Sequence, residues 1–210
     1  MYERRCWPHA LSGLVIALLL VGCTPAPATL EDSAASFVPS AGTSIEPPVV
    51  LSDFSLPSSQ GAQTRLSDLR GKVVLIYFGY TFCPDICPTT LGDLKRVRAE
   101  LGAQADQMAV LLVSVDPERD TPEVLSRYMA AFGEGFIGMS GDEATLRRIG
   151  KDYGLYYQRQ EFTGSSAGYL VDHSSATYLV DPNGQLRMVY SYGTPAEVIG
   201  PDVARFIAGG

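Results

Sequence analysis

Two apolar runs separated by a helical pattern constrain the fold more than any other feature of the sequence. "VVLIYFGY" at 73–80 and "MAVLLVSV" at 108–115 are rich in β-branched and aromatic residues, with almost no polar interruption. Such runs are typical of strands that are covered on both faces. Between them, apolar residues recur at helical spacing from 88 to 101. We therefore expect a buried sheet whose strands are connected by helices.

The segments around these two strands continue the alternation. Residues 54–72 are interpreted as two short strands and a turn, which form an N-terminal β-hairpin. A helix is predicted at 121–132, because Thr121 is a capping residue followed by proline. A short strand at 136–141 and a helix at 142–154, which ends at a glycine, complete this half of the chain.

Two further hairpins and a helix are predicted in the C-terminal part. Residues 155–162 and 168–173 flank a Ser/Gly-rich loop and form an inserted hairpin. A second hairpin turns at Pro182-Asn183-Gly184, and a closing helix follows, with a candidate interruption at Gly200-Pro201. The order of the elements predicts one α/β sandwich with a mixed central sheet, without an internal repeat or a second folded domain.

The amino terminus has the layout of a secretory signal. A basic stretch precedes the apolar run 11–21, which is too short to cross a bilayer comfortably, and small Gly22 precedes Cys23. A short uncleaved membrane anchor is the alternative interpretation. "LVGC" at 20–23 resembles the lipobox of bacterial lipoproteins, which implies cleavage after residue 22 and lipid attachment at Cys23.

We therefore divide the chain into a signal peptide at 1–22, a tether at 23–48 and a folded domain at 49–210. The tether is rich in Pro, Ala, Ser and Thr, a composition that favours a flexible linker. It would hold the domain at the extracytoplasmic face of a bacterial membrane through the lipid anchor.

Charge and compartment narrow the possible functions. The formal net charge is −7, and removal of residues 1–22, which carry one acidic and two basic residues, makes it −8. Such an acidic domain is a poor candidate for binding nucleic acid. Cleavage also removes Cys6 and His9, and lipid occupies Cys23, so Cys83, Cys87 and His173 remain. Outside the cytosol, thiols tend to be oxidised unless a reductant or a metal protects them.

Cys83 and Cys87 lie between a buried strand and a predicted helix. They could form a disulfide staple, a redox couple, a nucleophile with its resolving partner, or two metal ligands. A staple that closes so short a loop would constrain the unfolded chain little. Main-chain N–H groups at a helix start stabilise a thiolate, and four residues of helix rise about 6 Å, which suits both a redox-active disulfide and joint binding of one ion.

His173 decides what kind of metal site is available. It could be a hydrogen-bonded structural histidine at a strand end, or a third ligand beside the two thiolates. Zinc would need a fourth ligand, for which Asp85 or Asp172 is available. Thiolates suit Cu(I), and an added imidazole extends the site to Cu(II), so copper is the expected metal. The methionines in apolar patterns are expected in the core: Met108, Met129, Met139 and Met188.

Three blocks of the chain occur in an order and spacing that resemble the Sco/SenC family. They are "YTFCPDICP" at 80–88, "VSVDPERDTPEVL" at 113–125 and "YLVDHSSATYLVDPNG" at 169–184. The resemblance covers the chain from about Val49 to the end. It implies a thioredoxin-like fold and a copper site of Cys83, Cys87 and His173. Asp172 would be an outer partner of the histidine, and Asp116 would lie near the site.

The resemblance also implies a partner and a process. Members of the family assist assembly of the binuclear copper centre of respiratory cytochrome oxidase, so the expected partner is the oxidase subunit that carries this centre. Other copper carriers and thiol reductases are further partner classes. Nothing in the sequence resembles a heptad pattern, and we expect a monomeric domain.

Two departures distinguish the chain from thioredoxin-like reductases. Such proteins usually have two residues between the cysteines and a proline before the strand that here begins near Ala176. This chain has three intervening residues, and Ser174-Ser175 where the proline is expected. The residues around Cys83 also differ from those around a peroxiredoxin nucleophile. Within the Sco/SenC family a histidine is frequent just before the first cysteine, and this chain has Phe82 there.

These features favour a copper metallochaperone. The alternative is a thiol-disulfide oxidoreductase that reduces the cysteines of the oxidase copper site through a mixed disulfide. A third hypothesis is a copper-responsive sensor. Dependence on His173 separates the first from the second, because a dithiol reductase does not need the imidazole.

Overall fold

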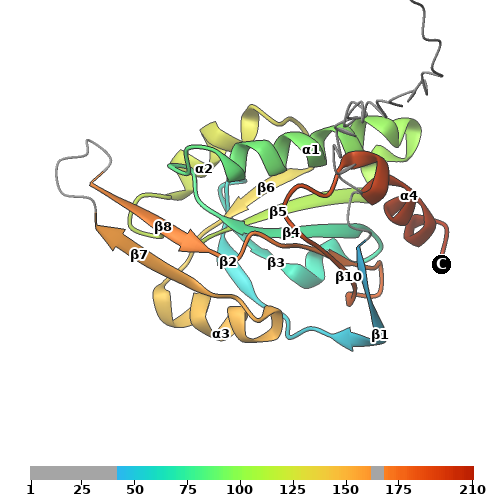
Figure 1. Cartoon of the computed structure of the whole chain (residues 1–210), viewed down its shortest axis with the longest axis horizontal. Helices are drawn as coiled ribbons and strands as arrows, with labels where there is room; N and C mark the ends of the chain where they lie inside the picture. Colours follow the sequence, from blue (N-terminus) through green and yellow to red (C-terminus); the bar gives the residue numbers. More distant parts are fainter. Residues whose placement is uncertain (1–41, 162–167) are drawn as a thin grey trace, which may run out of the picture. The chain divides into compact units, whose positions relative to one another are not determined.

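The two apolar runs form the centre of a six-stranded sheet in the computed structural model, which describes residues 42–161 and 168–210. β4 (Val73–Gly79) and β5 (Met108–Ser114) pair in parallel, from Val73 opposite Met108 to Gly79 opposite Ser114. All their residues are buried, as the uninterrupted apolar patterns predict. Because the two strands run in the same direction, the loops that follow them leave the sheet at the same edge (Figure 1).

The other strands make the sheet mixed, as expected. Its order is β1-β10-β9-β4-β5-β6. β6 (Phe136–Met139) is parallel to β5, whereas β9 (Thr177–Val180) is antiparallel to β4. β10 (Gln185–Tyr190) returns beside β9 after the predicted turn, in which Gly184 has a positive φ of 74°. The predicted sandwich with a mixed sheet is therefore confirmed.

Helices cover both faces of this sheet (Figure 1). α1 (Ile86–Glu100) and α3 (Glu143–Tyr153) lie on opposite faces, because Tyr77 contacts Cys87 of α1 while its neighbour Phe78 packs against Tyr153 of α3. α4 (Ala196–Ile207) packs beside α1. α2 (Pro122–Ala130) packs against β6. Two short 3₁₀ helices, at Leu66–Leu69 and Gly102–Gln107, complete the helical elements described.

Local capping explains where two of the helices begin and end. At α2, the Thr121 side chain accepts a hydrogen bond from the Val124 N–H, and Pro122 follows the cap. At α3, the Asp142 carboxylate accepts from the Thr145 N–H at 2.9 Å, and Gly154 ends the helix with a left-handed φ of 61°. In α4 the considered interruption does not occur, since one helix runs through Pro201.

The first described strand, β1 (Thr43–Val50), lies partly in the segment assigned from the sequence to the tether. It pairs antiparallel with β10, and its register shifts between Ser44 and Val49, around Pro47 and Pro48. Most of its side chains are exposed, so it has no apolar pattern that could reveal it. Main-chain pairing with β10 therefore defines this strand.

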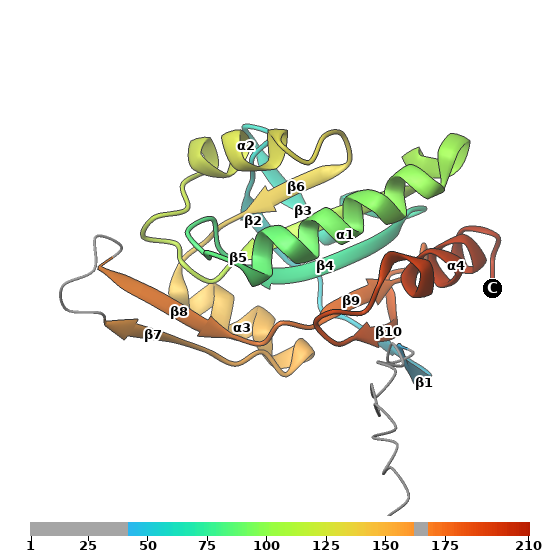
Figure 2. The same ribbon diagram turned by 45° about the horizontal axis from the view of Figure 1, so that its top comes forward.

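Two hairpins form small sheets of their own; the first is bridged to β6 between Ser58 and Met139, and Figure 2 shows the second beside the main sheet. β2 (Ser55–Pro57) pairs with β3 (Gln63–Arg65), which confirms the expected N-terminal hairpin. β7 (Tyr157–Glu161) pairs with β8 (Tyr169–His173), which confirms the inserted hairpin. Most of the loop at 163–168 lies outside the described residues.

The signal peptide, Cys23 and most of the tether also lie outside the described residues. Among the residues that the structure describes, no helix combines the length and the apolar character that a membrane span requires.

The central strands should dominate stability. Leu112 of β5 is fully buried, whereas Val50 at the end of β1 is 72% exposed. We expect Leu112→Ala to lower the free energy of unfolding by about 2–5 kcal/mol, because it leaves a cavity in the core. Val50→Ala, the matched control, should change it by less than about 0.5 kcal/mol. Urea unfolding of both variants measures the difference, and equal losses would contradict the central place of β5.

Candidate metal centre

Three donor side chains converge beyond the carboxyl end of β4. Cys83 lies in the loop after β4, Cys87 in the first turn of α1, and His173 at the last position of β8. One donor atom from each lies within 4.8 Å of the other two. Among the described residues, no carboxylate joins this group, so Asp85 and Asp172 do not extend it to four donors. The structure thus brings together the three residues that the sequence singles out.

Cys87 occupies the buried side of the group. Its Sγ accepts a hydrogen bond from the Tyr77 hydroxyl at 3.6 Å and lies 3.5 Å from Nε2 of His173. Its main-chain N–H points to Cys83 Sγ at 3.4 Å. This N–H belongs to the first turn of α1, where such groups have no partner within the helix. The helix start thus supplies a donor to the Cys83 sulfur.

The two cysteines differ in their affinity for a proton. The hydrogen bond from Cys87 lowers the pKa of the Cys83 thiol to about 4, and the main-chain N–H groups of Asp85 and Cys87 act in the same direction, against the effect of burial. The bond with Cys83, together with burial, raises the pKa of the Cys87 thiol. In the metal-free protein, the thiolate therefore resides on Cys83 and the proton on Cys87.

His173 presents Nε2 to the cysteines. Its Nδ1 lies 2.9 Å from the main-chain carbonyl oxygen of Ser174, which can only accept a hydrogen bond. Nδ1 must then carry the proton of the neutral ring, which leaves the lone pair of Nε2 available to a metal. The rings of Tyr77 and Tyr80 meet the imidazole edge to face, with centroids 6.0 and 5.8 Å away. Hydrogen bonding and packing thus fix the ring.

The two carboxylates expected near the site have other hydrogen-bond partners. Asp172 is exposed, and its carboxylate accepts from the Gln160 side chain at 3.0 Å, while Ser174 occupies Nδ1 of His173. Asp116 is buried, accepts from the Tyr169 hydroxyl at 2.7 Å and forms an ion pair with Arg119. Neither contact reaches a donor atom of the site directly.

Tyr77 and Gly79 contribute to the site although they were not singled out from the sequence. A Cβ at Gly79 would lie 3.0 Å from Cys87 Sγ and 2.8 Å from the Tyr77 ring, so only glycine leaves room for the sulfur here. A glycine inside an apolar strand is the available signal, because it often marks a close approach of other groups. No feature of the sequence indicates the hydrogen bond between Tyr77 and Cys87.

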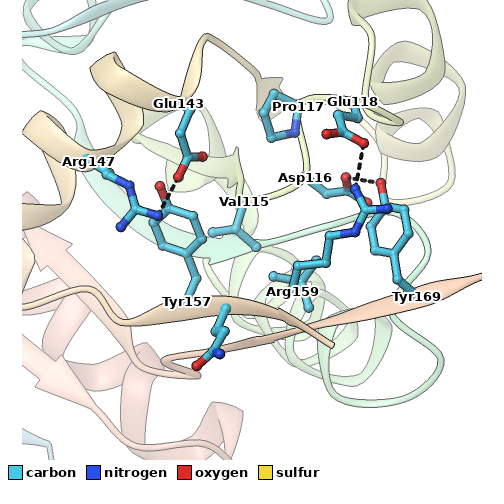
Figure 3. A pocket seen from close by; sticks show the side chains of 11 residues that line it. Val115, Asp116, Pro117, Glu118, Glu143, Arg147, Tyr157, Arg159 and Tyr169 are labelled. Atoms are coloured by element: carbon cyan, nitrogen blue, oxygen red, sulfur yellow. Dashed lines mark hydrogen bonds and ion pairs between the residues drawn. The ribbon is translucent and has the colours of Figure 1, made fainter. Parts of the chain in front are cut away.

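A surface pocket opens onto the donor group. It is lined by residues of the cysteine loop and of β8: Tyr80, Cys83, Pro84, Asp85, Ile86, Leu170, Val171, Asp172 and His173. Cys83 and His173 line it, whereas the fully buried Cys87 does not. A larger cavity, between α3 and the β7–β8 hairpin, contains none of the three donors (Figure 3). Its charged groups pair with one another, as in Glu143–Arg147 and Glu118–Arg159.

Comparison with known proteins finds relatives in both sequence and fold. Residues 42–208 match the SCO1/SenC family. A SCO2-like protein of Rickettsia felis is 36% identical over 148 residues, which are 70% of this chain and 72% of the relative. Copper-bound ScoI of Arabidopsis thaliana has a TM-score of 0.71 at 29% identity, over 77% of this chain and 100% of that chain. Apo Sco1 of Thermus thermophilus has a TM-score of 0.69 at 40% identity, over 78% and 95%.

The fold and the donor group define a thioredoxin-like protein with a site of two thiols and one imidazole. The chain belongs to the SCO1/SenC family. The resemblance noted from the sequence and the fold expected from it are both confirmed.

The unequal thiols predict selective alkylation of the reduced, metal-free protein. At about pH 6, iodoacetamide should modify Cys83 in preference to Cys87, because only Cys83 is a thiolate there. The rate should stay nearly constant above this pH and fall as the pH decreases through about 4, where Cys83 takes up a proton. Peptide mass spectrometry locates the label, with Cys83→Ser as control. A rate that rises about tenfold per pH unit near neutrality would indicate an ordinary thiol.

Gly79 allows a second test. Gly79→Ala should lower the free energy of unfolding of the metal-free protein by about 1–3 kcal/mol, because the new methyl group collides with buried neighbours. Gly92→Ala in α1 is the matched control, since a Cβ there meets nothing within 4 Å. It should be neutral or stabilising by up to ~1 kcal/mol. Urea unfolding measures both, and a harmless Gly79→Ala would contradict the described packing.

Proposed function

We propose that this chain is a copper metallochaperone that carries copper on Cys83, Cys87 and His173. The observation that carries this proposal is the convergence of two thiols and one imidazole, without a fourth donor among the described residues. Zinc sites of the structural type are closed by four protein ligands. A set of two sulfurs and one nitrogen suits Cu(I), and the imidazole also accommodates Cu(II). The copper-bound Arabidopsis relative supports the same choice.

The arrangement of the donors suits a metal that is cargo. Cys83 is a thiolate in the metal-free protein and lines the surface pocket, so it can meet an incoming ion first. Cys87 then has to release its proton as the ion binds, since metals bind the thiolate form. Transfer to an acceptor thiolate can begin at the pocket, by exchange at Cys83 while Cys87 still holds the ion.

We further propose where the protein works and which partner it serves. The lipobox-like segment places lipid on Cys23, and the tether lets the domain reach a membrane-embedded partner from the extracytoplasmic side. Membership of the SCO1/SenC family points to assembly of the binuclear copper centre of cytochrome c oxidase. The acceptor would then be the oxidase subunit that carries this centre. Oxidation of Cys83 and Cys87 to a disulfide would remove two ligands and stop copper loading.

A thiol-disulfide oxidoreductase is the second candidate function. The lowered pKa of Cys83 and the neighbouring Cys87 thiol are what a dithiol reductase requires. Cys83 would attack a disulfide of the oxidase copper site to form a mixed disulfide, and Cys87 would resolve it. The reduced acceptor dithiol would leave, and the pair would end as a disulfide. This reaction does not use Nε2 of His173.

An anaerobic Cu(I) competition titration of the reduced protein tests the first candidate. We expect one tightly bound ion per chain and at least about tenfold weaker binding in His173→Ala, because the variant loses one ligand. Tyr192→Ala is the control, since it removes an exposed aromatic side chain outside the donor group. Its affinity should match that of the unmodified protein.

Two further results would decide against copper transport and in favour of the oxidoreductase. Absence of a high-affinity site, or a site that is indifferent to His173→Ala, would overturn the copper assignment. Reduction of a disulfide-bonded peptide at equal rates by the unmodified protein and by His173→Ala would then establish the second function.

A further inference from the structure

The strand that carries His173 is not part of the main sheet, from which the cysteine loop leaves. Among the described strands, β8 pairs with β7 alone, whereas the cysteine loop follows β4 at the centre of the main sheet. Figure 2 shows the β7–β8 hairpin beside the ends of β4 and β5. No main-chain ladder joins β8 to β4 directly; β8 is connected through residues 174–176 to β9, which pairs with β4. Side chains supply the direct contacts between β8 and the cysteine loop.

The side chains of Tyr80 and Arg119 bond the main chain of β8. The Val171 N–H donates to the hydroxyl oxygen of Tyr80 at 3.1 Å, two residues before His173. Nη1 of Arg119 donates to the Tyr169 carbonyl at 3.1 Å. Because residues 169 and 171 are two apart on a strand, these main-chain groups face the same side of the hairpin. Tyr80 belongs to the cysteine loop, and Arg119 to the turn after β5.

Arg119 contacts both parts of the site region at once. Its guanidinium carbon lies 3.6 Å from the centroid of the Tyr169 ring on β8. On the cysteine loop it lies 4.7 Å from the ring of Phe82 and 5.7 Å from that of Tyr80. The side chain is only 16% exposed, so these contacts are largely shielded from water. A planar guanidinium can stack on rings and donate hydrogen bonds simultaneously, which an ammonium group cannot do.

The turn that carries Arg119 is fixed at both ends. Asp116 forms an ion pair with Arg119 and accepts from the Tyr169 hydroxyl at 2.7 Å; Figure 3 shows Asp116 facing Tyr169. Asp120 is fully buried and accepts from the Thr81 N–H at 3.0 Å and from the Thr81 hydroxyl at 2.6 Å. The residues at 116–120 thus bind the hairpin on one side and the cysteine loop on the other.

We infer that Arg119 is a positioning residue that holds the histidine hairpin against the cysteine loop and thereby places His173 as the third copper ligand. This inference rests on the proposed copper site. The described contacts of Arg119 join β8 to the cysteine loop, so it acts by holding β8 in place. Loss of its contacts leaves the two sulfurs in their loop and helix but loosens the strand that carries the imidazole. The effect of Arg119 on copper binding therefore depends on the presence of His173.

A double-mutant cycle on the full chain tests this dependence. The variants are Arg119→Lys, which keeps the charge beside Asp116, His173→Ala, and the two combined, each titrated with Cu(I) under competition. We expect Arg119→Lys to weaken binding by about fivefold or more in the unmodified chain, and by less than about twofold when His173 is absent. Arg127→Lys, at an exposed position of α2, is the matched control and should have no effect.

Two results would overturn the inference. Equal weakening by Arg119→Lys with and without His173 would show a general structural effect, and unchanged affinity would show that the hairpin keeps its place without Arg119.

A measurement on the metal-free protein separates the failure of this inference from the failure of the copper proposal. Amide hydrogen exchange should be faster at Val171 in Arg119→Lys than in the unmodified chain, by about tenfold, and unchanged in the buried strand β5. If the chain binds no copper but shows this local change, the copper proposal fails and the holding role of Arg119 stands. If exchange at Val171 is unchanged, the holding role fails, whatever copper does.

Discussion

The parallel pairing of β4 with β5 is the constraint on which the rest of the structure depends. Both strands are buried along their whole length, so neither can shift without exposing apolar side chains. Their pairing places the loop of Cys83 and the turn of Arg119 at the same end of the sheet, where both strands finish. Hydrogen bonds from Thr81 to Asp120 join these loops. The positions of the functional loops are therefore set by two apolar strands that contribute no metal ligand themselves.

The donor group combines opposite environments within a few ångströms. Cys83 sits at the pocket, where helix N–H groups and the neighbouring thiol favour its charge, while Cys87 lies under the Tyr77 hydroxyl with its proton retained. His173 comes from a separate hairpin and turns Nε2 inward because Ser174 occupies Nδ1. Only one of the two thiols is therefore ionised in the metal-free protein, and this limits the free-energy cost of burying charge at the site.

Local signals explain why much of the fold could be predicted from the sequence. The apolar runs identified β4 and β5, and Asp142 with Gly154 defined the limits of α3. Spacing and residue type also singled out Cys83, Cys87 and His173, which the structure brings together. The residues that escaped prediction act through tertiary contacts. Tyr77 and Arg119 have no local pattern that reveals a partner, and β1 is defined by pairing with β10, since its own side chains are mostly exposed.

That exposed strand has a consequence for how copies of this chain can meet. β1 forms one edge of the six-stranded sheet, and an unprotected edge invites another chain to add a strand to it. Pro47 and Pro48 carry no N–H, and the register of β1 shifts around them. A neighbouring molecule would thus find an interrupted row of donors. Copies of this chain would in this way be hindered from pairing their sheets edge to edge into aggregates.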